Sequence, residues 1–261
     1  MPEFRVLALG DVCGDCGIDF VCSRLPELKR ELSIDFCVVN GENCSMLGIT
    51  PSQADTLFSH GANVVTLGNH AFARREITSY LETRRDILRP ANIPAVNAGY
   101  GWYVYDLGRV SVAVIALVGR VDMDPAENPF ILADKLLAEP GIASCGIKLV
   151  EFHAEATSEK LTMGYFLDGK VTAVWGTHTH VQTSDARVLP EGTGAVCDVG
   201  MCGARHSVLG SKPDAAVRMF LGHPRERFVS EQGPAKLEGA VITADTASGK
   251  CVSIEAIRIN E

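Results

Sequence analysis

Short apolar runs rich in β-branched residues alternate with amphipathic segments along most of this chain, and that alternation constrains the fold more than any other feature. We expect strands over residues 5–9, 36–39, 63–67, 110–117, 147–152 and 171–175. Strands separated by helical segments are typical of α/β architecture with a largely parallel sheet. The sequence therefore predicts an α/β fold.

Helix and hairpin signals fill the intervals between these strands. Thr50, Pro51 and Gln53 have the residue types of an N-cap, a first-turn proline and an N3 partner, and Gly61 marks the expected end of that helix. Two more helices are predicted over residues 158–166 and 213–221, and two hairpins over 102–118 and 237–259, with turns at 107–109 and near 248–249. Residues 183–212 are the least regular part of the chain, and we expect loops around a site there.

Length and composition favour a single domain over residues 1–261. The chain has 261 residues, 46% of them apolar and 21% charged, which is enough material for one packed core. Its apolar runs are about nine residues long at most, whereas a membrane helix needs roughly 18 to 20. The N-terminus reaches an acidic residue too soon for a secretory signal, and an odd number of cysteines, nine, does not suggest a secreted disulfide framework. We expect a cytoplasmic protein with no membrane contact and with mostly buried, reduced cysteines.

The net charge limits the class of ligand. A formal charge of −8 argues against an extensive nucleic-acid surface, which needs many Lys and Arg side chains facing phosphates. A small phosphorylated substrate stays open, because bound metal cations reverse the local sign of an acidic pocket. A homo-oligomer is also left open.

Five of the expected strands end in residue types that bind divalent metals. They are Asp11 after VLALG, Glu42 and Asn43 after CVVNG, Asn69 and His70 after VVTLG, His153 after KLVEF, and His178 and His180 after AVWGT. Ligand sites of open α/β sheets lie at the carboxyl ends of parallel strands, so residues far apart in sequence converge there. The pattern as a whole predicts a metal site.

Each of these residues also has a purely structural interpretation. Asp11 is the kind of residue that caps a helix, Asn43 and Asn69 suit left-handed turn positions, and His153 suits a hydrogen-bonded core position. The His178 and His180 pair is more specific, since a spacing of two on an extended segment points both imidazoles to one side.

The number of donors favours two metal ions over one. A tetrahedral zinc is satisfied by three or four ligands, whereas this set offers two carboxylates, at least one amide oxygen and three imidazoles, with His70 in addition. A glutamate carboxylate such as that of Glu42 is able to bridge two cations. Two ions roughly 3.5–4 Å apart form the clamp used for displacement at phosphorus. Mixed nitrogen and oxygen ligation suits iron, manganese or zinc better than calcium or magnesium.

The segments that carry these residues resemble the metallophosphoesterases, and among them the bacterial YmdB family. The similar segments are GDV (10–12), NGEN (40–43), GNH (68–70), EFHAEATSEK (151–160) and GTHTHVQTSD (176–185), followed by RPAN (89–92), PF (129–130), DVGM (198–201) and the C-terminal strands. All five main blocks occur in order, and the similarity covers nearly the whole chain. The resemblance implies a four-layer α/β/β/α sandwich and a di-metal centre, often iron, that acts on phosphodiesters including 2′,3′-cyclic nucleotides.

The resemblance also implies a division of the ligands. One ion would take Asp11, Glu42, Asn43 and His180, and the other would take Glu42 as a bridge, Asn69, His153 and His178. His70 would lie beside the metals as the proton donor to the leaving oxygen, which agrees with its being the histidine left over when the metals are filled. Asn43 has an alternative role as a hydrogen-bond donor to the phosphate.

The chain departs from the broad metallophosphoesterase pattern at two places. Cys13 stands where a metal-binding histidine is common. With Cys16 it forms a CxxC pair, a pattern that is compatible with redox chemistry or with a thiolate metal ligand. Two small buried side chains are the simpler interpretation. Arg205 and His206 replace an acidic turn, which makes them candidates for substrate contacts, with an exposed loop as the alternative.

We therefore expect a di-metal phosphodiesterase that hydrolyses small phosphodiesters with a metal-bridging hydroxide and with His70 as general acid. Two alternatives are a regulatory protein that binds a nucleotide or a partner with little turnover, and a phosphomonoesterase of similar architecture. Purified protein that holds metal but has no activity on any phosphodiester would favour the binding protein. Comparing cyclic nucleotides with nucleoside monophosphates as substrates separates the phosphodiesterase from the phosphomonoesterase.

Overall fold

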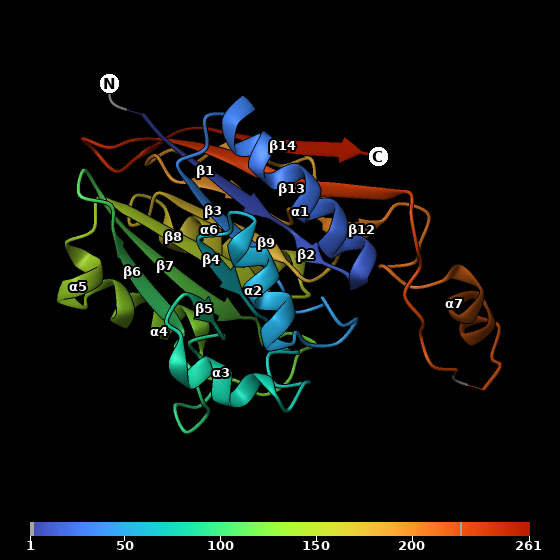
Figure 1. Cartoon of the computed structure of the whole chain (residues 1–261). Coiled ribbons are helices and arrows are strands. Elements are labelled where there is room, and N and C mark those ends of the chain that lie inside the picture. The colour runs from blue at the N-terminus through green and yellow to red at the C-terminus, as the bar shows by residue number, and fades with distance from the viewer. Residues whose placement is uncertain (1–2, 225) are drawn as a thin grey trace.

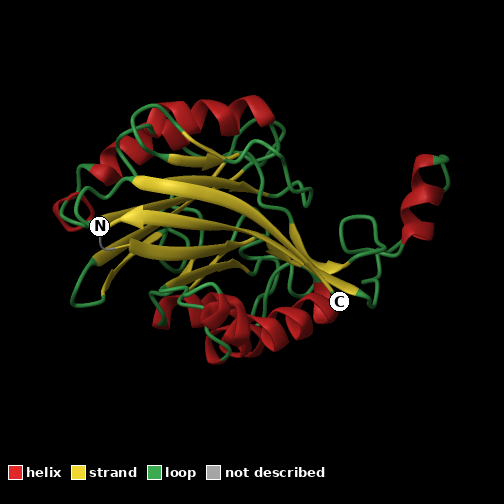
Figure 2. Ribbon diagram, turned by 90° about the horizontal axis from the view of Figure 1, so that it is seen from above, coloured by secondary structure: helices red, strands yellow, loops and turns green. Residues whose placement is uncertain are grey.

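Two β-sheets packed face to face, with helices on both outer sides, make up the computed structural model, which describes residues 3–224 and 226–261 (Figure 2). The predicted four-layer α/β/β/α arrangement is confirmed. The sequence-predicted strands and helices are present, within one or two residues at most ends. The strand expected over 171–175 is shifted to β9 (Ala173–Thr177), because its ladder with the neighbouring strand continues to the pair of His153 with Thr177.

The first sheet has eight strands and contains the first and the last strand of the described chain, β1 and β14 (Figure 1). Its members are β1 (Glu3–Leu9), β2 (Asp11–Val12), β3 (Phe36–Asn40), β4 (Val64–Thr66), β5 (Ile87–Leu88), β12 (Met201–Ala204), β13 (Ala235–Asp245) and β14 (Cys251–Asn260). β1, β3, β4 and β5 are parallel, whereas β13 joins β1 antiparallel and pairs with β14 as the predicted C-terminal hairpin.

The second sheet has six strands in the order β10-β11-β9-β8-β7-β6. Its members are β6 (Trp102–Asp106), β7 (Ser111–Val118), β8 (Ile147–His153), β9, β10 (Arg187–Val188) and β11 (Gly194–Val196). β7, β8 and β9 are parallel, and β6 with β7 forms the other predicted hairpin. Residues 183–212, expected to be loops, also contain the short strands β10, β11 and β12.

The helices divide between the two outer faces, apart from one. α1 (Gly14–Glu31), α2 (Pro51–Ser59) and α3 (Ile77–Thr83) contribute buried residues to the core outside the first sheet, and α4 (Pro129–Leu137), α5 (Pro140–Ala143) and α6 (Thr157–Leu167) to that outside the second. α2 begins with the capping box of Thr50 and Gln53 that the sequence predicted. α7 (Pro213–Phe220) stands apart from the layers (Figures 1 and 2), and Ala216 is its buried residue. No helix in residues 3–224 or 226–261 is long and apolar enough to cross a membrane.

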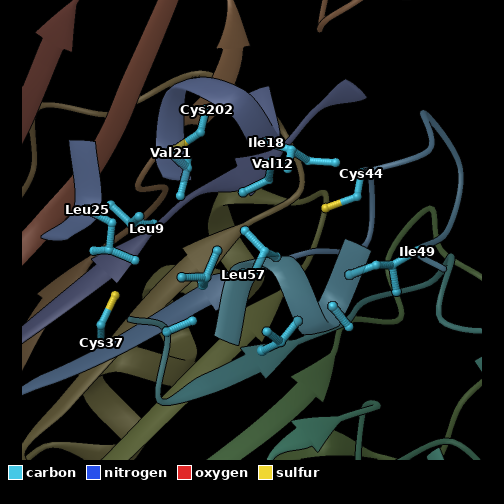
Figure 3. Packing of buried hydrophobic residues seen from close by; sticks show 14 of the residues in the cluster. Leu9, Val12, Ile18, Val21, Leu25, Cys37, Cys44, Ile49, Leu57 and Cys202 are labelled. Carbon is cyan, nitrogen blue, oxygen red and sulfur yellow. The ribbon is translucent and has the colours of Figure 1, made fainter. Parts of the chain in front are cut away.

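Three hydrophobic cores fill the spaces between the four layers. Along β1, Phe4, Val6 and Ala8 belong to the core between the sheets, whereas Leu7 and Leu9 belong to the core with residues of α1 and α2. Figure 3 shows Leu9 packed near Leu25 of α1. Both faces of the central strands are therefore covered, which explains why these strands read as continuous apolar runs instead of alternating ones. The carboxyl ends of parallel strands from both sheets meet at one edge, where Glu42 after β3 lies 2.9 Å from His153 at the end of β8.

Candidate metal centre

The predicted ligands converge where the carboxyl ends of the parallel strands of both sheets meet. Asp11, Glu42 and Asn69 follow β1, β3 and β4 of the first sheet, while His153 ends β8 and His178 follows β9 of the second. Donor atoms of Glu42, His153 and His178 all lie within 4.8 Å of one another. The centre thus joins the two sheets.

One group of donors surrounds Nε2 of His153. Oε1 of Glu42 and Oδ1 of Asn69 each lie 2.9 Å from this nitrogen, and Nδ1 of His178 lies 3.0 Å from it. Glu42 and His153 are fully buried. Three residue types that bind transition metals therefore lie around one largely buried point.

A second group lies around Asp11, which is also fully buried. Its Oδ1 is 3.7 Å from Nε2 of His180 and 3.4 Å from the amide nitrogen of Asn43. The same amide nitrogen lies 3.4 Å from Oε1 of Glu42, so Glu42 borders both groups. Asn43 presents its nitrogen here, and a 180° rotation of the amide places its oxygen at the same point.

One nitrogen of each imidazole contacts a residue outside the centre, and the other nitrogen faces the centre. Nδ1 of His153 lies 2.9 Å from Oγ1 of Thr177, Nε2 of His178 lies 3.0 Å from Glu155, and Nδ1 of His180 lies 3.3 Å from the Leu209 carbonyl oxygen. An outer acceptor of this kind fixes the tautomer of a metal-binding histidine. Nε2 of His153, Nδ1 of His178 and Nε2 of His180 are then the nitrogens that face the centre.

The local backbone conformation allows the donor side chains to lie close together. His178 and His180 both have positive φ, 99° and 61°, a strained choice for residues other than glycine that is concentrated at functional sites. Gly68 precedes Asn69 and lies close to residues of both sheets: a Cβ there would lie 2.3 Å from a ring carbon of His153 and 2.4 Å from Oε2 of Glu42. Only glycine fits this position.

Glu151 is a buried carboxylate beneath the centre that the sequence analysis missed. Its side chain accepts hydrogen bonds from Asn40 at 2.6 Å, Thr66 at 2.5 Å and Thr177 at 3.1 Å, residues at the ends of β3, β4 and β9. Thr177 in turn accepts from His153, so the carboxylate and the imidazole are linked through one hydroxyl. The glutamate lies in the segment EFHAEATSEK, and its position two residues before His153 on a strand was the available signal.

Burial and charge pairing both act on the ionisable groups. Burial by itself would raise the pKa of Glu42, but the neighbouring His153 lowers it below its ordinary value. Burial by itself would lower the pKa of His153, but the neighbouring Glu42 raises it above its ordinary value. Despite its burial, Asp11 has its pKa lowered by His180. Burial and the neighbouring His153 lower the pKa of His178 to about 4, which keeps this imidazole neutral with a free lone pair.

This donor set fits divalent cations. Two carboxylates without solvent need positive charge beside them, and two imidazole nitrogens only 3.0 Å apart need a proton or a cation between them. Neutral imidazole, carboxylate and amide oxygen are the forms that transition metals bind.

A cavity of about 770 Å³ opens over the centre and includes His70 in its lining. The backbone N–H of His70 donates to Oε2 of Glu42 at 3.0 Å, and its ring is half-buried. Arg205 and His206 are exposed and do not line this cavity, so they are withdrawn as candidates for substrate contacts. The same irregular segment instead contributes Leu209, because the chain turns back toward His180 there.

Cys13 and Cys16 are both buried, as expected, and both are free thiols. Sγ of Cys13 lies 3.6 Å from Nδ1 of His180, on the side of the ring turned away from Asp11. Burial raises the pKa of Cys13, which favours the thiol over the thiolate. Cys16 belongs to a separate small cluster with Ala204 and Ala235.

Comparisons with known proteins identify the family and structures of the same fold. The family model described as YmdB-like protein matches residues 7–257. The 2′,3′-cyclic-nucleotide 2′-phosphodiesterase of Bacillus subtilis is 40% identical over 98% of this chain and 97% of its own length. A crystal structure of a novel phosphatase from Mycoplasma pneumoniae has a TM-score of 0.93 at 32% identity, covering 100% of this chain and 95% of that one. A crystal structure of a protein from Thermus thermophilus has a TM-score of 0.91 at 36% identity, covering 99% of this chain and 100% of that one.

Proposed function

Because this chain belongs to the YmdB-like protein family, we propose that it is a metal-dependent phosphodiesterase of small phosphodiesters, with 2′,3′-cyclic nucleotides as its substrates. The observation that carries the proposal is the meeting of the Glu42, His153 and His178 donor atoms at the floor of a cavity large enough for a nucleotide. The name of the B. subtilis relative supports the choice of substrate.

We assign the ligands to two ions as the two donor groups suggest. Asp11, Glu42, Asn43 and His180 would hold one, and Glu42, Asn69, His153 and His178 would hold the other, with Glu42 shared. Iron is the proposed metal, with manganese and zinc as alternatives, since three imidazoles accompany the oxygen donors. When bound, the ions would supply a nucleophilic water at neutral pH and offset the charge of the phosphate.

The chain itself supplies the proton for the departing oxygen. We assign that role to His70, whose ring lines the cavity and whose backbone is tied to the shared Glu42. A histidine is suited to the task because its ordinary pKa is about 6.5, near the working pH. Oε2 of Glu42 thus positions the general acid while Oε1 lies toward His153.

Two measurements on the same sample test the proposal. Elemental analysis of aerobically and anaerobically purified protein should give about two ions per chain. The metal-replete protein should hydrolyse 2′,3′-cyclic nucleotides and should leave nucleoside monophosphates unchanged. Metal without hydrolysis of any phosphodiester would point to a binding protein, and faster turnover of monophosphates would point to a phosphomonoesterase.

We further propose that residues 1–261 act as one domain in the cytoplasm. A core shared by both sheets supports the first point. Nine cysteines that are all buried free thiols support the second, because such usage suits a reducing compartment.

A further inference from the structure

The cavity over the metal centre has two chemically different walls. One wall includes the proposed ligands Glu42, Asn43, His178 and His180 together with His70. The other consists of large apolar side chains from three loops: Met46 and Leu47, Leu209, and Phe228 and Val229. Leu47, Leu209, Phe228 and Val229 are 43–53% exposed, which is unusual for a cluster of such residues in one hollow. The phosphate chemistry described above uses only the first wall.

Two residues of the apolar wall are held in strained backbone conformations. Met46 has φ of 67° and Leu209 has φ of 53°, and both are large side chains for which the left-handed region is rarely adopted. The N–H of Met46 donates to the Asn43 carbonyl, and the Leu209 carbonyl accepts from His180, so each strained residue is bonded directly to a residue of the metal centre. Strain of this kind is concentrated at binding sites, where surrounding contacts maintain it.

Phe228 reaches the cavity from the far end of the segment that carries α7. The two ends of this segment pair with each other: Lys212 N–H donates to the Val229 carbonyl and Glu231 N–H donates to the Gly210 carbonyl, both at 2.9 Å. Ser230, two residues after Phe228, also lies against the start of α1, since a Cβ on Gly14 would lie 2.2 Å from its Oγ. The position of Phe228 is thus fixed by the base of the segment and not by α7 itself.

We propose that Phe228, with Met46 and Leu209 in the lining of the same cavity, forms the subsite for the nucleobase of a nucleotide whose phosphate lies at the metal centre. The inference rests on the proposed function. An aromatic ring stacks on any base, because every base has a π face, and the flanking aliphatic side chains exclude water from that stack. A phosphoester without a planar apolar group would make no stacking contact with the apolar wall. The subsite therefore selects nucleotides among phosphoesters.

Equilibrium binding tests the subsite separately from turnover. Adenosine 3′-monophosphate and inorganic phosphate are titrated calorimetrically into metal-loaded protein. Phe228→Ala should weaken binding of the nucleotide by roughly 5- to 100-fold, the cost of one lost base stack, and should leave binding of phosphate unchanged. Phe228→Tyr should restore nucleotide affinity. Phe220→Ala is the matched control, because Phe220 belongs to α7, is 84% exposed and does not line the cavity.

The outcomes separate this inference from the proposed function. If wild type cleaves cyclic nucleotides while Phe228→Ala binds adenosine 3′-monophosphate as tightly as wild type, the subsite is wrong and the function stands. If wild type cleaves no phosphodiester but binds the nucleotide through Phe228, the function is wrong and the subsite stands. Equal losses in Phe228→Ala and Phe220→Ala would overturn the subsite, since they would show a general effect of the segment.

Discussion

Nζ of Lys160 donates a 2.7 Å hydrogen bond to Oδ2 of Asp198 in a place almost closed to solvent. The same oxygen accepts from the backbone N–H and the hydroxyl of Thr179, the residue between His178 and His180. One buried ion pair therefore connects α6 to the loop that presents two of the proposed ligands. Neither partner touches the metal centre, so their effect on it is one of position.

Asp198→Asn should destabilise the protein by about 3–5 kcal/mol, because Lys160 would remain buried without a counter-charge. Chemical unfolding measures the change. The exposed pair of Lys170 and Asp134 provides the control, and Asp134→Asn should cost about 0–1 kcal/mol. Equal losses of unfolding free energy in the two variants would show that burial does not increase the cost of removing the partner of Lys160.

Glu42→Gln should lose more metal than any variant of a residue assigned to a single ion, because Glu42 alone is asked to serve both. Elemental analysis should find fewer than one ion per chain, against about one for Asn69→Ala. Glu238→Gln is the control, since Glu238 is equally buried but interacts with Lys236 and Arg258 on the first sheet. Full retention of both ions by Glu42→Gln would exclude the bridging role.

Glu151→Gln should weaken metal affinity by about 10- to 100-fold, although Glu151 is not a proposed ligand, because the change breaks the chain that orients His153 through Thr177. Competition with a chelator measures the affinity. Thr177→Val removes the hydroxyl that joins His153 to Glu151 but keeps the hydrogen bonds of Glu151 with Asn40 and Thr66, and it should show part of the loss. Wild-type affinity in both variants would show that His153 needs no such support.

His70→Ala should keep both metals and lose most turnover of 2′,3′-cyclic nucleotides, about 10²- to 10⁴-fold, because a ribose oxygen leaves poorly without a proton. Hydrolysis of bis(p-nitrophenyl) phosphate should fall much less, since p-nitrophenolate departs unprotonated. The exposed His60, replaced by Ala, serves as the control. Equal losses on the two substrates would mean that His70 holds metal or phosphate.

Replacing Cys13 and Cys16 together by Ser should leave metal content and activity within a few-fold of wild type. The physical reason is that burial raises the pKa of both thiols, which disfavours the thiolate a metal would bind. Elemental analysis and the cyclic-nucleotide assay provide the readout. Loss of one ion in the double variant would establish Cys13 as a ligand beside His180.

The layers and the convergence of the proposed ligands were predictable because both depend on local signals. Strand ends, the Thr50 cap and the two hairpins each lie within a few adjacent residues. The meeting of Asp11 with His180 also requires the two sheets to pack with the carboxyl ends of their parallel strands at the same edge.

The rest depends on contacts between distant segments. α1 was not predicted, because Gly14, Gly17 and Pro26 weaken a helix signal, and packing overrides that weakness: a Cβ on Gly17 would lie 2.3 Å from the Cys202 carbonyl oxygen. The cavity wall was missed for a similar reason, since Phe228 and Met46 are 182 positions apart (228 minus 46) and carry no shared pattern.

The division of the donors between two sheets makes metal loading a measure of assembly. Asp11, Glu42 and Asn69 belong to one sheet and His153 and His178 to the other, and a slip of one residue between neighbouring strands would turn a ligand to the opposite face. A chain whose halves are formed but misaligned would therefore stay unloaded. Metal content per chain therefore measures the fraction of molecules in which the two sheets are correctly packed, without an activity assay.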